Sequence, residues 1–192
     1  MTPPLVSWAG LILVALLIAA AATDLKYGKI YNVVTYPAVA VGLIGHTLCG
    51  GLTGDDARWM GLTGALAGLA AGFLPLLAAW KAGGIGGGDA KVMAAIGALM
   101  GWRFALATLF YGLIVAAIMA FAVMIRRRIV WATLKRLGRF LYLVLTPTKP
   151  AAPVTQDSPK IAFGLALCFG AAAAVVEAMI RGGMTPGRIL GF

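Results

Sequence analysis

The chain has 192 residues, of which 61% are hydrophobic and only 11% are charged. This composition, with several apolar runs close to bilayer length, excludes a soluble globular domain and predicts an all-α, polytopic integral membrane protein. The formal net charge of +10 would indicate a nucleic-acid partner in a soluble protein. In a membrane protein the positive-inside rule and anionic lipid headgroups account for it, so we expect contact with lipid and none with nucleic acid.

Apolar runs divided by short polar stretches predict about six transmembrane helices in one membrane-embedded domain, residues 1–192. The first segment, Leu5 to Thr23, lacks the positively charged leading region of a signal peptide, so we expect it to remain as a membrane helix. The other segments are predicted at residues 33–49, 60–80, 90–102, 104–125 and 161–180. The segment at 90–102 is short for a bilayer crossing.

A polar turn from Asp24 to Lys29 follows the first segment. Asp24 falls at the C-terminal end of a helix, where the helix dipole disfavours a carboxylate and where Lys, Arg or Gly would be the usual structural choice. Asp24 is therefore a functional candidate. The structural alternative is a boundary residue that pairs with Lys26 or Lys29 at the surface.

A glycine-rich loop, residues 83–91, separates the third and fourth segments and carries Asp89 and Lys91. Glycine has no Cβ, so this loop can bend tightly and let a substrate or another backbone approach closely. A carboxylate at the mouth of a membrane helix is costly to place, which makes Asp89 a second functional candidate. The structural alternative is that Asp89 caps the N-terminus of its helix.

Basic residues predict the orientation of these segments. The first, third and fifth loops carry twelve Lys and Arg residues, eight of them in a basic loop at about 126–160, whereas the other side carries four. The positive-inside rule then places both termini outside and puts Asp24 and Asp89 on the cytoplasmic side. Residues 126–139 interleave basic and apolar side chains, which predicts an amphipathic helix on anionic headgroups.

The two aspartates are compatible with two classes of function. Two carboxylates that share a proton can activate water for peptide hydrolysis, one as base and one as acid. They can also form an ion relay in a small ion-coupled transporter or channel component. A transporter would be expected to show internal repeats and discontinuous helices near the bilayer midplane. The sequence shows no repeat beyond the two Asp-x-Lys pairs, and both aspartates are predicted near one surface. These residues alone leave both classes open.

Three stretches of the sequence resemble motifs of the type IV prepilin peptidases. Gly86-Gly87-Gly88-Asp89-Ala90-Lys91 is similar to the family's G-x-G-D-x-K motif. Asp24, followed by Ile30-Tyr31-Asn32-Val33-Val34-Thr35, resembles the first aspartate and the I-P-N-x-L-T stretch. Ala162-Phe163-Gly164-Leu165-Ala166 resembles the P-Y-G-x-A patch before the last helix. Tyr31 and Ala162 stand where the family commonly has proline.

This resemblance implies a membrane aspartic endopeptidase, a hydrolase of the bacterial cytoplasmic (inner) membrane. Its substrate would be a type IV prepilin precursor, whose basic leader is cut just after a glycine at the cytoplasmic face. The resemblance implies Asp24 and Asp89 as the catalytic pair, supported by Gly86, Gly88, Lys91 and Asn32, with no cofactor and no metal. The small chain is most similar to the peptidases of tight-adherence (Flp) pilus systems. It lacks a cysteine-rich zinc loop, so N-methylation is not expected.

The remaining polar and sulfur side chains are interpreted as structural. His46 lies toward the outer side of its segment, where we expect a packing role because no second metal ligand is evident. Glu177 is expected to be a boundary residue that reaches Arg181 one turn later. Cys49 and Cys168 lack metal-type spacing and are interpreted as small packing residues.

A row of small residues in the third segment predicts helix packing. Gly64, Gly68 and Gly72 are spaced by four and therefore lie on one face of a helix. In a membrane, such a smooth face allows the backbone of a neighbouring helix to come close. We expect this face to contact another transmembrane segment.

Overall fold

The computed structural model describes residues 8–54, 60–131, 133, 135 and 163–181. These residues are helical, with turns between the helices, and contain no strand. The helices are α1 (Trp8–Tyr27), α2 (Asn32–Gly50), α3 (Gly61–Lys81), α4 (Gly87–Met100), α5 (Trp102–Arg126) and α7 (Phe163–Arg181). The predicted all-α class and all six predicted segments are thereby confirmed as helices.

Five of these helices are long and apolar enough to cross a membrane, namely α1, α2, α3, α5 and α7. The exception is α4, which has 14 residues. At 1.5 Å per residue it is roughly 21 Å long, shorter than the roughly 30 Å hydrocarbon core of a bilayer. The chain is therefore a polytopic membrane protein in which one short helix is enclosed by longer ones.

The first helix continues beyond the predicted boundary at Thr23. It ends at Tyr27, so Asp24 lies in its last turn instead of in a polar turn after it. Gly28 stops the helix with a positive φ of 59°, and its N–H bonds to the Asp24 carbonyl at 2.8 Å. A left-handed glycine is a common helix stop. Of the predicted amphipathic helix at 126–139, residues 132, 134 and 136–139 lie outside the described residues. In the described part, α5 ends at Arg126, a turn follows at 127–128, and residues 130, 131, 133 and 135 are helical again.

The short helix α4 forms the centre of the core. From Asp89 to Met100 every residue except Lys91 is buried, and α4 contacts α1, α2, α3 and α7. Its sequence is apolar or small on every side, the pattern of a helix that is covered all round. Because α4 is enclosed, the residues at its beginning are held by several neighbouring helices at once.

Two of the three glycines in the predicted packing row allow α3 to lie directly against α4. A Cβ on Gly68 would collide with the backbone at Gly97, and a Cβ on Gly72 would collide with the backbone at Met93. The predicted packing surface is confirmed at these positions. Gly64 differs, since its nearest neighbour is the side chain of Met60 just before α3.

His46 joins the far end of α4 to α2. It is completely buried, its Nε2 donates to the Leu99 carbonyl at 2.9 Å, and its ring lies 4.9 Å from the Trp8 ring. Leu99 lies in the last turn of α4, where backbone carbonyls have no partner within the helix. The interpretation of His46 as a packing residue fits this position.

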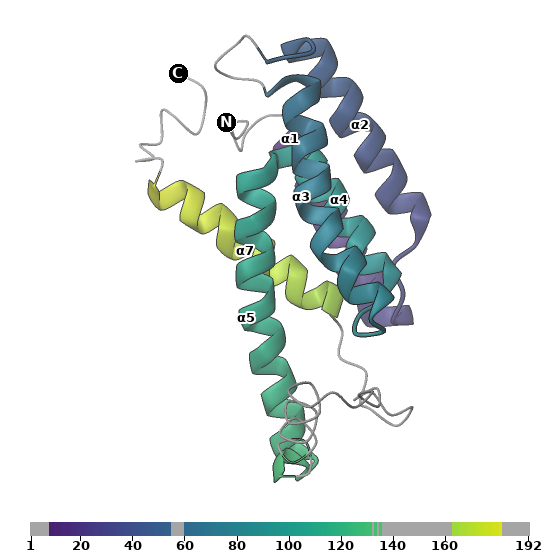
Figure 1. Ribbon diagram of the computed structural model, residues 1–192, viewed down its shortest axis with the longest axis vertical. Helices are drawn as coiled ribbons and strands as arrows, with labels where there is room; N and C mark the ends of the chain where they lie inside the picture. The colour runs from purple at the N-terminus through teal and green to yellow at the C-terminus, as the bar shows by residue number, and fades with distance from the viewer. Residues whose placement is uncertain (1–7, 55–59, 132, 134, 136–162, 182–192) are drawn as a thin grey trace, which may run out of the picture. The chain divides into compact units, whose positions relative to one another are not determined.

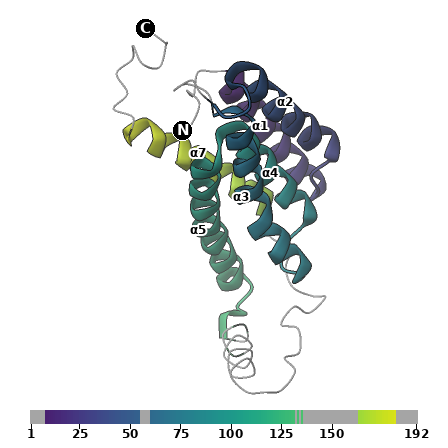
Figure 2. The ribbon, with the colours of Figure 1, turned by 45° about the horizontal axis from the view of Figure 1, so that its top comes forward.

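The chain divides into two compact units, residues 1–115 with 162–192, and residues 116–161. In the first unit, α1, α2, α3 and α4 lie side by side, and the beginning of α7 points toward them (Figure 1). Figure 2 shows the same arrangement after a turn of 45°. α7 contacts α1 and α4 and crosses α5 where Gly112 lies against Gly170. All candidate site residues belong to this first unit.

Candidate functional site

Asp24 lies in the last turn of α1, and its carboxylate contacts the beginning of α7. Its Oδ2 accepts a hydrogen bond of 3.0 Å from the backbone N–H of Leu165, and its side chain is only 8% exposed. The first N–H groups of a helix have no partner within it, and this end of the helix dipole is positive. The beginning of α7 therefore offsets the unfavourable end of α1. Asp24 bonds to this backbone and pairs with neither Lys26 nor Lys29 within the described residues.

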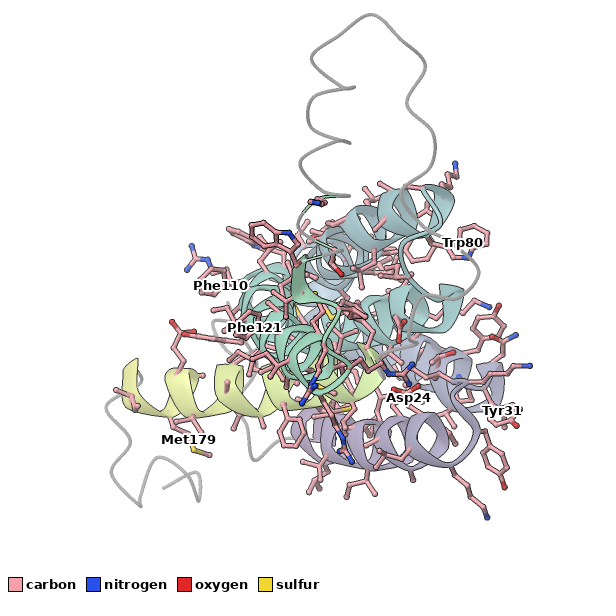
Figure 3. All side chains as sticks on the ribbon, turned by 90° about the horizontal axis from the view of Figure 1, so that it is seen from below. Asp24, Tyr31, Trp80, Phe110, Phe121 and Met179 are labelled. Carbon is pink, nitrogen blue, oxygen red and sulfur yellow. The ribbon has the colours of Figure 1, made fainter. Side chains whose placement is uncertain are left out.

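Gly164 makes this contact possible. A Cβ at Gly164 would lie 2.9 Å from Oδ2 and 3.1 Å from Cγ of Asp24, so any side chain would push the carboxylate away. Figure 3 shows Asp24 close to the inner end of α7, whereas Tyr31 and Trp80 lie at the periphery of the helices. Gly164 was not among the predicted site residues. The signal that could have identified it is the resemblance of residues 162–166 to the P-Y-G-x-A patch.

Asp89 lies in the first turn of α4 and is 7% exposed. It is not the N-cap residue, which is Gly86 in an extended conformation. The Asp89 carboxylate instead reaches back toward Gly86 and has a hydrogen bond with its backbone. A Cβ on Gly86 would lie 3.1 Å from Asp89 Oδ2. This geometry resembles the second half of a capping box, in which the third helical residue bonds to the N-cap N–H. Asp89 thus retains a capping role, although not as the N-cap itself.

Electrostatics links the two aspartates. The pKa of Asp89 is raised to about 6, mainly by burial and also by the charge of Asp24, while the hydrogen bond with the Gly86 backbone lowers it. A nearby like charge disfavours ionisation of a carboxyl group. The two acidic residues that the sequence selected from different motifs therefore lie near enough for the charge of Asp24 to act on Asp89, although burial is the larger cause of the raised pKa.

Ile30 is a further residue at the site that the sequence analysis quoted only as part of a motif. It follows α1, in the turn before α2, and its side chain packs on Gly88 and Gly164, which are the second residues of α4 and α7. A Cβ on Gly88 would lie 3.1 Å from Ile30 Cβ, and a Cβ on Gly164 would lie 2.9 Å from Ile30 Cδ1. Ile30 therefore lies between the beginnings of α4 and α7.

Lys91 and Asn32, both predicted to support the site, bond to each other. Lys91 Nζ donates to Asn32 Oδ1 at 2.7 Å and lies 5.3 Å from the centre of the Tyr36 ring. The hydrogen bond joins the first turn of α2 to the second turn of α4. A cation near an aromatic face adds a further attraction. The geometry makes Lys91 a tether between helices, and Tyr36 was not foreseen.

Cys168 lies near the pair as well. It is one helical turn after Gly164, its Sγ is 3.5 Å from the Leu17 carbonyl, and the charges of both aspartates act on it. Cys168 and Cys49 are free thiols. Within the described ranges, no group of three or more His, Cys, Asp or Glu side chains is placed to hold a metal ion.

Glu177 lies in the last two turns of α7, away from Leu165, and the Arg181 side chain with which it was predicted to pair lies outside the described part of the chain.

A cavity of about 310 Å³ lies between α1 and α2. Neither aspartate lines it, and its lining side chains are all apolar, which does not suit hydrolytic chemistry. The lining residues are Ile12, Ala15, Leu16, Ala19, Val34, Pro37, Ala38 and Val41.

The model of the type IV leader peptidase family matches residues 11–121, more than half of the chain. The matched range contains Asp24, Asn32, Asp89 and Lys91, and it ends before α7. Neither a curated protein nor a solved structure matches the chain.

Proposed function

The chain belongs to the type IV leader peptidase family, and from this premise we propose that Asp24 and Asp89 are the catalytic pair of a membrane aspartic endopeptidase. Its substrates are type IV prepilin precursors, from which it removes the basic leader. The observation that carries the proposal is the juxtaposition of the two buried carboxylates, where the charge of Asp24 contributes to the raised pKa of Asp89. Acid–base hydrolysis requires two interacting carboxyl groups whose pKa values differ, so that one is charged while the other is protonated.

The chemistry uses one carboxylate and one carboxylic acid. The carboxylate takes a proton from water, and the water oxygen forms a bond to the carbonyl carbon of the scissile peptide. The carboxylic acid gives its proton to the carbonyl oxygen at the same time. The first residue then passes its proton to the leaving nitrogen while the second recovers one from a hydroxyl. The C–N bond breaks, and both residues return to their starting state.

The supporting residues act by placement. Lys91 and Asn32 tie α4 to α2. Gly86 leaves room for the Asp89 carboxylate, and Gly88 allows the beginning of α4 to lie close to Ile30. A displacement of the order of 1 Å at a reacting group costs roughly a hundredfold in rate. These four residues can therefore support catalysis simply by holding the reacting groups in position.

The finer assignment rests on the sequence resemblance. We propose cleavage after a glycine at the cytoplasmic face of the bacterial inner membrane, on precursors of the tight-adherence (Flp) type. The alternative function, a transporter or channel component with relay carboxylates, is not favoured, because the matched family consists of leader peptidases.

Incubation of the purified, reconstituted protein with a Flp-type prepilin tests this proposal. The expected result is a loss of mass equal to that of the leader up to and including its last glycine. A matched precursor with that glycine replaced by valine should stay intact. Persistence of the unmodified precursor at full length, under conditions in which the peptidase is folded, contradicts the proposal.

A further inference from the structure

We propose that the backbone N–H of Leu165, presented at the beginning of α7, holds Asp24 as the charged carboxylate that activates water, and thereby leaves Asp89 as the proton donor. This inference rests on the proposed function, because it divides the two chemical roles between the residues of that pair. Leu165 acts through Asp24 and is a positioning residue.

The first argument is the contact itself. Leu165 is the third residue of α7, so its N–H is one of those that the helix leaves without an internal partner. It is directed at Asp24 Oδ2 from 3.0 Å. A hydrogen bond donated to a carboxylate stabilises the charged form, and the positive end of the α7 dipole offsets the negative end of α1, in whose last turn Asp24 lies.

The second argument is that the local structure preserves this contact. Gly164 leaves no room for even one methyl group beside the Asp24 carboxylate, so the carboxylate lies directly on the backbone of α7. Ile30 packs against the same glycine and lies between the beginnings of α7 and α4. Asp24 and Ile30 therefore both pack on Gly164, the residue before the donor.

The third argument is the contrast with Asp89. Its carboxylate also has a backbone hydrogen bond, with Gly86, but burial and the charge of Asp24 outweigh that bond and favour the protonated form. The two residues therefore differ in their environment although both are nearly inaccessible. Such a difference is what separates the acid from the base in a carboxyl pair.

Other ionisable groups near Asp24 leave this assignment intact. Asp89 of α4 and Cys168 of α7 both interact with Asp24 electrostatically. Lys91 of α4 bonds to Asn32 and lies over the Tyr36 ring of α2, and Lys26 of α1 lies over the Tyr27 ring. Lys29, in the turn after α1, makes no ion pair with Asp24 among the described residues.

The roles assign each proton in the reaction. Asp24 takes the proton of the attacking water, and Asp89 gives its proton to the carbonyl oxygen of the scissile peptide. When the tetrahedral intermediate collapses, Asp24 returns its proton to the leaving nitrogen and Asp89 regains one from a hydroxyl. Leu165 loses and gains nothing, since its N–H stays bonded to Oδ2.

The substitution Leu165→Pro removes the donor while leaving a residue that the first turn of a helix accommodates. Leu165→Ala is the matched control, because it shortens the side chain and keeps the N–H. We expect the acidic limb of the pH–rate profile of Leu165→Pro to move upward by about one pH unit, roughly a tenfold loss of rate at low pH. The profile of Leu165→Ala should keep the wild-type limbs.

Three outcomes overturn the inference: a Leu165→Pro profile that superimposes on the wild type, an equal loss of rate at every pH, and movement of the basic limb in place of the acidic one. If Leu165→Pro does not fold, an amide-to-ester replacement at Leu165 removes the same N–H with less disturbance, and an ester at Gly164 is its control. The same shift is then expected for the Leu165 ester alone.

Failure of the proposed function gives a different result. In that case the wild-type protein leaves the prepilin intact, or Asp24→Asn or Asp89→Asn retains cleavage, whatever the Leu165 variants do. If both Asn variants are inactive and the limbs of the Leu165 variants do not move, the catalytic pair stands and only the role of the α7 backbone is refuted.

Discussion

Lys91 Nζ lies 2.7 Å from Asn32 Oδ1, which joins two motifs that are far apart in the sequence. Asn32 is the first residue of α2, and the half-buried Lys91 lies in the second turn of α4. The bond draws the beginning of α4, with Asp89, toward the turn that follows Asp24. It therefore connects the two halves of the candidate site without touching either carboxylate.

Loss of this bond should slow cleavage without abolishing it. We expect Lys91→Ala to reduce the rate by a few tens of fold, about 2 kcal/mol in the barrier. Asn32→Ala should have a similar effect, and the double variant should be little worse than either single one, because both remove the same interaction. Lys81→Ala, which removes an exposed lysine at the end of α3, is the control. Steady-state cleavage of a prepilin measures all four variants, and complete inactivity of a folded Lys91→Ala protein would mean a direct role in the chemistry.

Gly88 should tolerate alanine less well than Gly84 in the same loop. A Cβ on Gly88 would meet Ile30 at 3.1 Å, closer than ordinary packing, whereas a Cβ on Gly84 would lie 3.4 Å from the nearest atom. Gly88→Ala must therefore displace Ile30 or the beginning of α4, and we expect a loss of about tenfold in cleavage rate. Gly84→Ala should behave as wild type. Equal rates for both variants would show that the contact with Ile30 is unimportant.

The raised pKa of Asp89, about 6 against an ordinary 3.8, predicts how stability depends on pH. The folded chain holds this proton more tightly than the unfolded chain, so the stabilising contribution is complete below about pH 4 and is lost as the pH rises through about 6. The free energy of unfolding should fall across this window by up to roughly 3 kcal/mol.

Asp89→Asn should lose this part of the pH dependence and be more stable than wild type at pH 7, as expected where a functional group is held in an unfavourable environment. In Asp24→Asn the fall in the free energy of unfolding should move to lower pH, because the charge of Asp24, one of the two causes that raise the pKa of Asp89, is gone. Thermal unfolding in detergent over a pH series measures both effects. An unchanged pH dependence in Asp89→Asn would contradict the assignment of the raised pKa.

Helices and motifs could be predicted from the sequence, whereas the contacts that organise the site could not. Apolar runs of bilayer length identify α1, α2, α3, α5 and α7 because local composition decides whether a segment enters a membrane. The end of α1 was misplaced because Asp24 to Lys29 has the composition of a polar turn. Leu25 and Lys26 are good helix formers, and the helix continues through them to Tyr27 before Gly28 stops it.

The acid pair was selected from sequence by its unfavourable positions and its motifs, but the contact of α7 with Asp24 was not. That contact depends on where a distant helix begins in space, and no local pattern reports it. Gly164 and Ile30 illustrate the same limit, since a glycine reveals its importance only when the atom that its missing Cβ would meet is known.

The orientation of the chain remains a prediction from the distribution of basic residues, and labelling can test it. In a background without Cys49 and Cys168, Leu52→Cys should react with an impermeant thiol reagent added outside the cell, because Leu52 lies in an exposed turn on the predicted outer side. Lys29→Cys should react only after the membrane is permeabilised. The opposite pattern would contradict cleavage at the cytoplasmic face.

Prepilin cleavage by Asn variants of the two aspartates tests the central claim most directly. An amide cannot exchange the proton that hydrolysis requires, so Asp24→Asn and Asp89→Asn should each abolish cleavage while the purified proteins stay folded. The double variant should be no worse than either single one, since residues that act as a unit are not additive. Substantial cleavage by either folded Asn variant would remove that residue from the catalytic pair and contradict the proposed function.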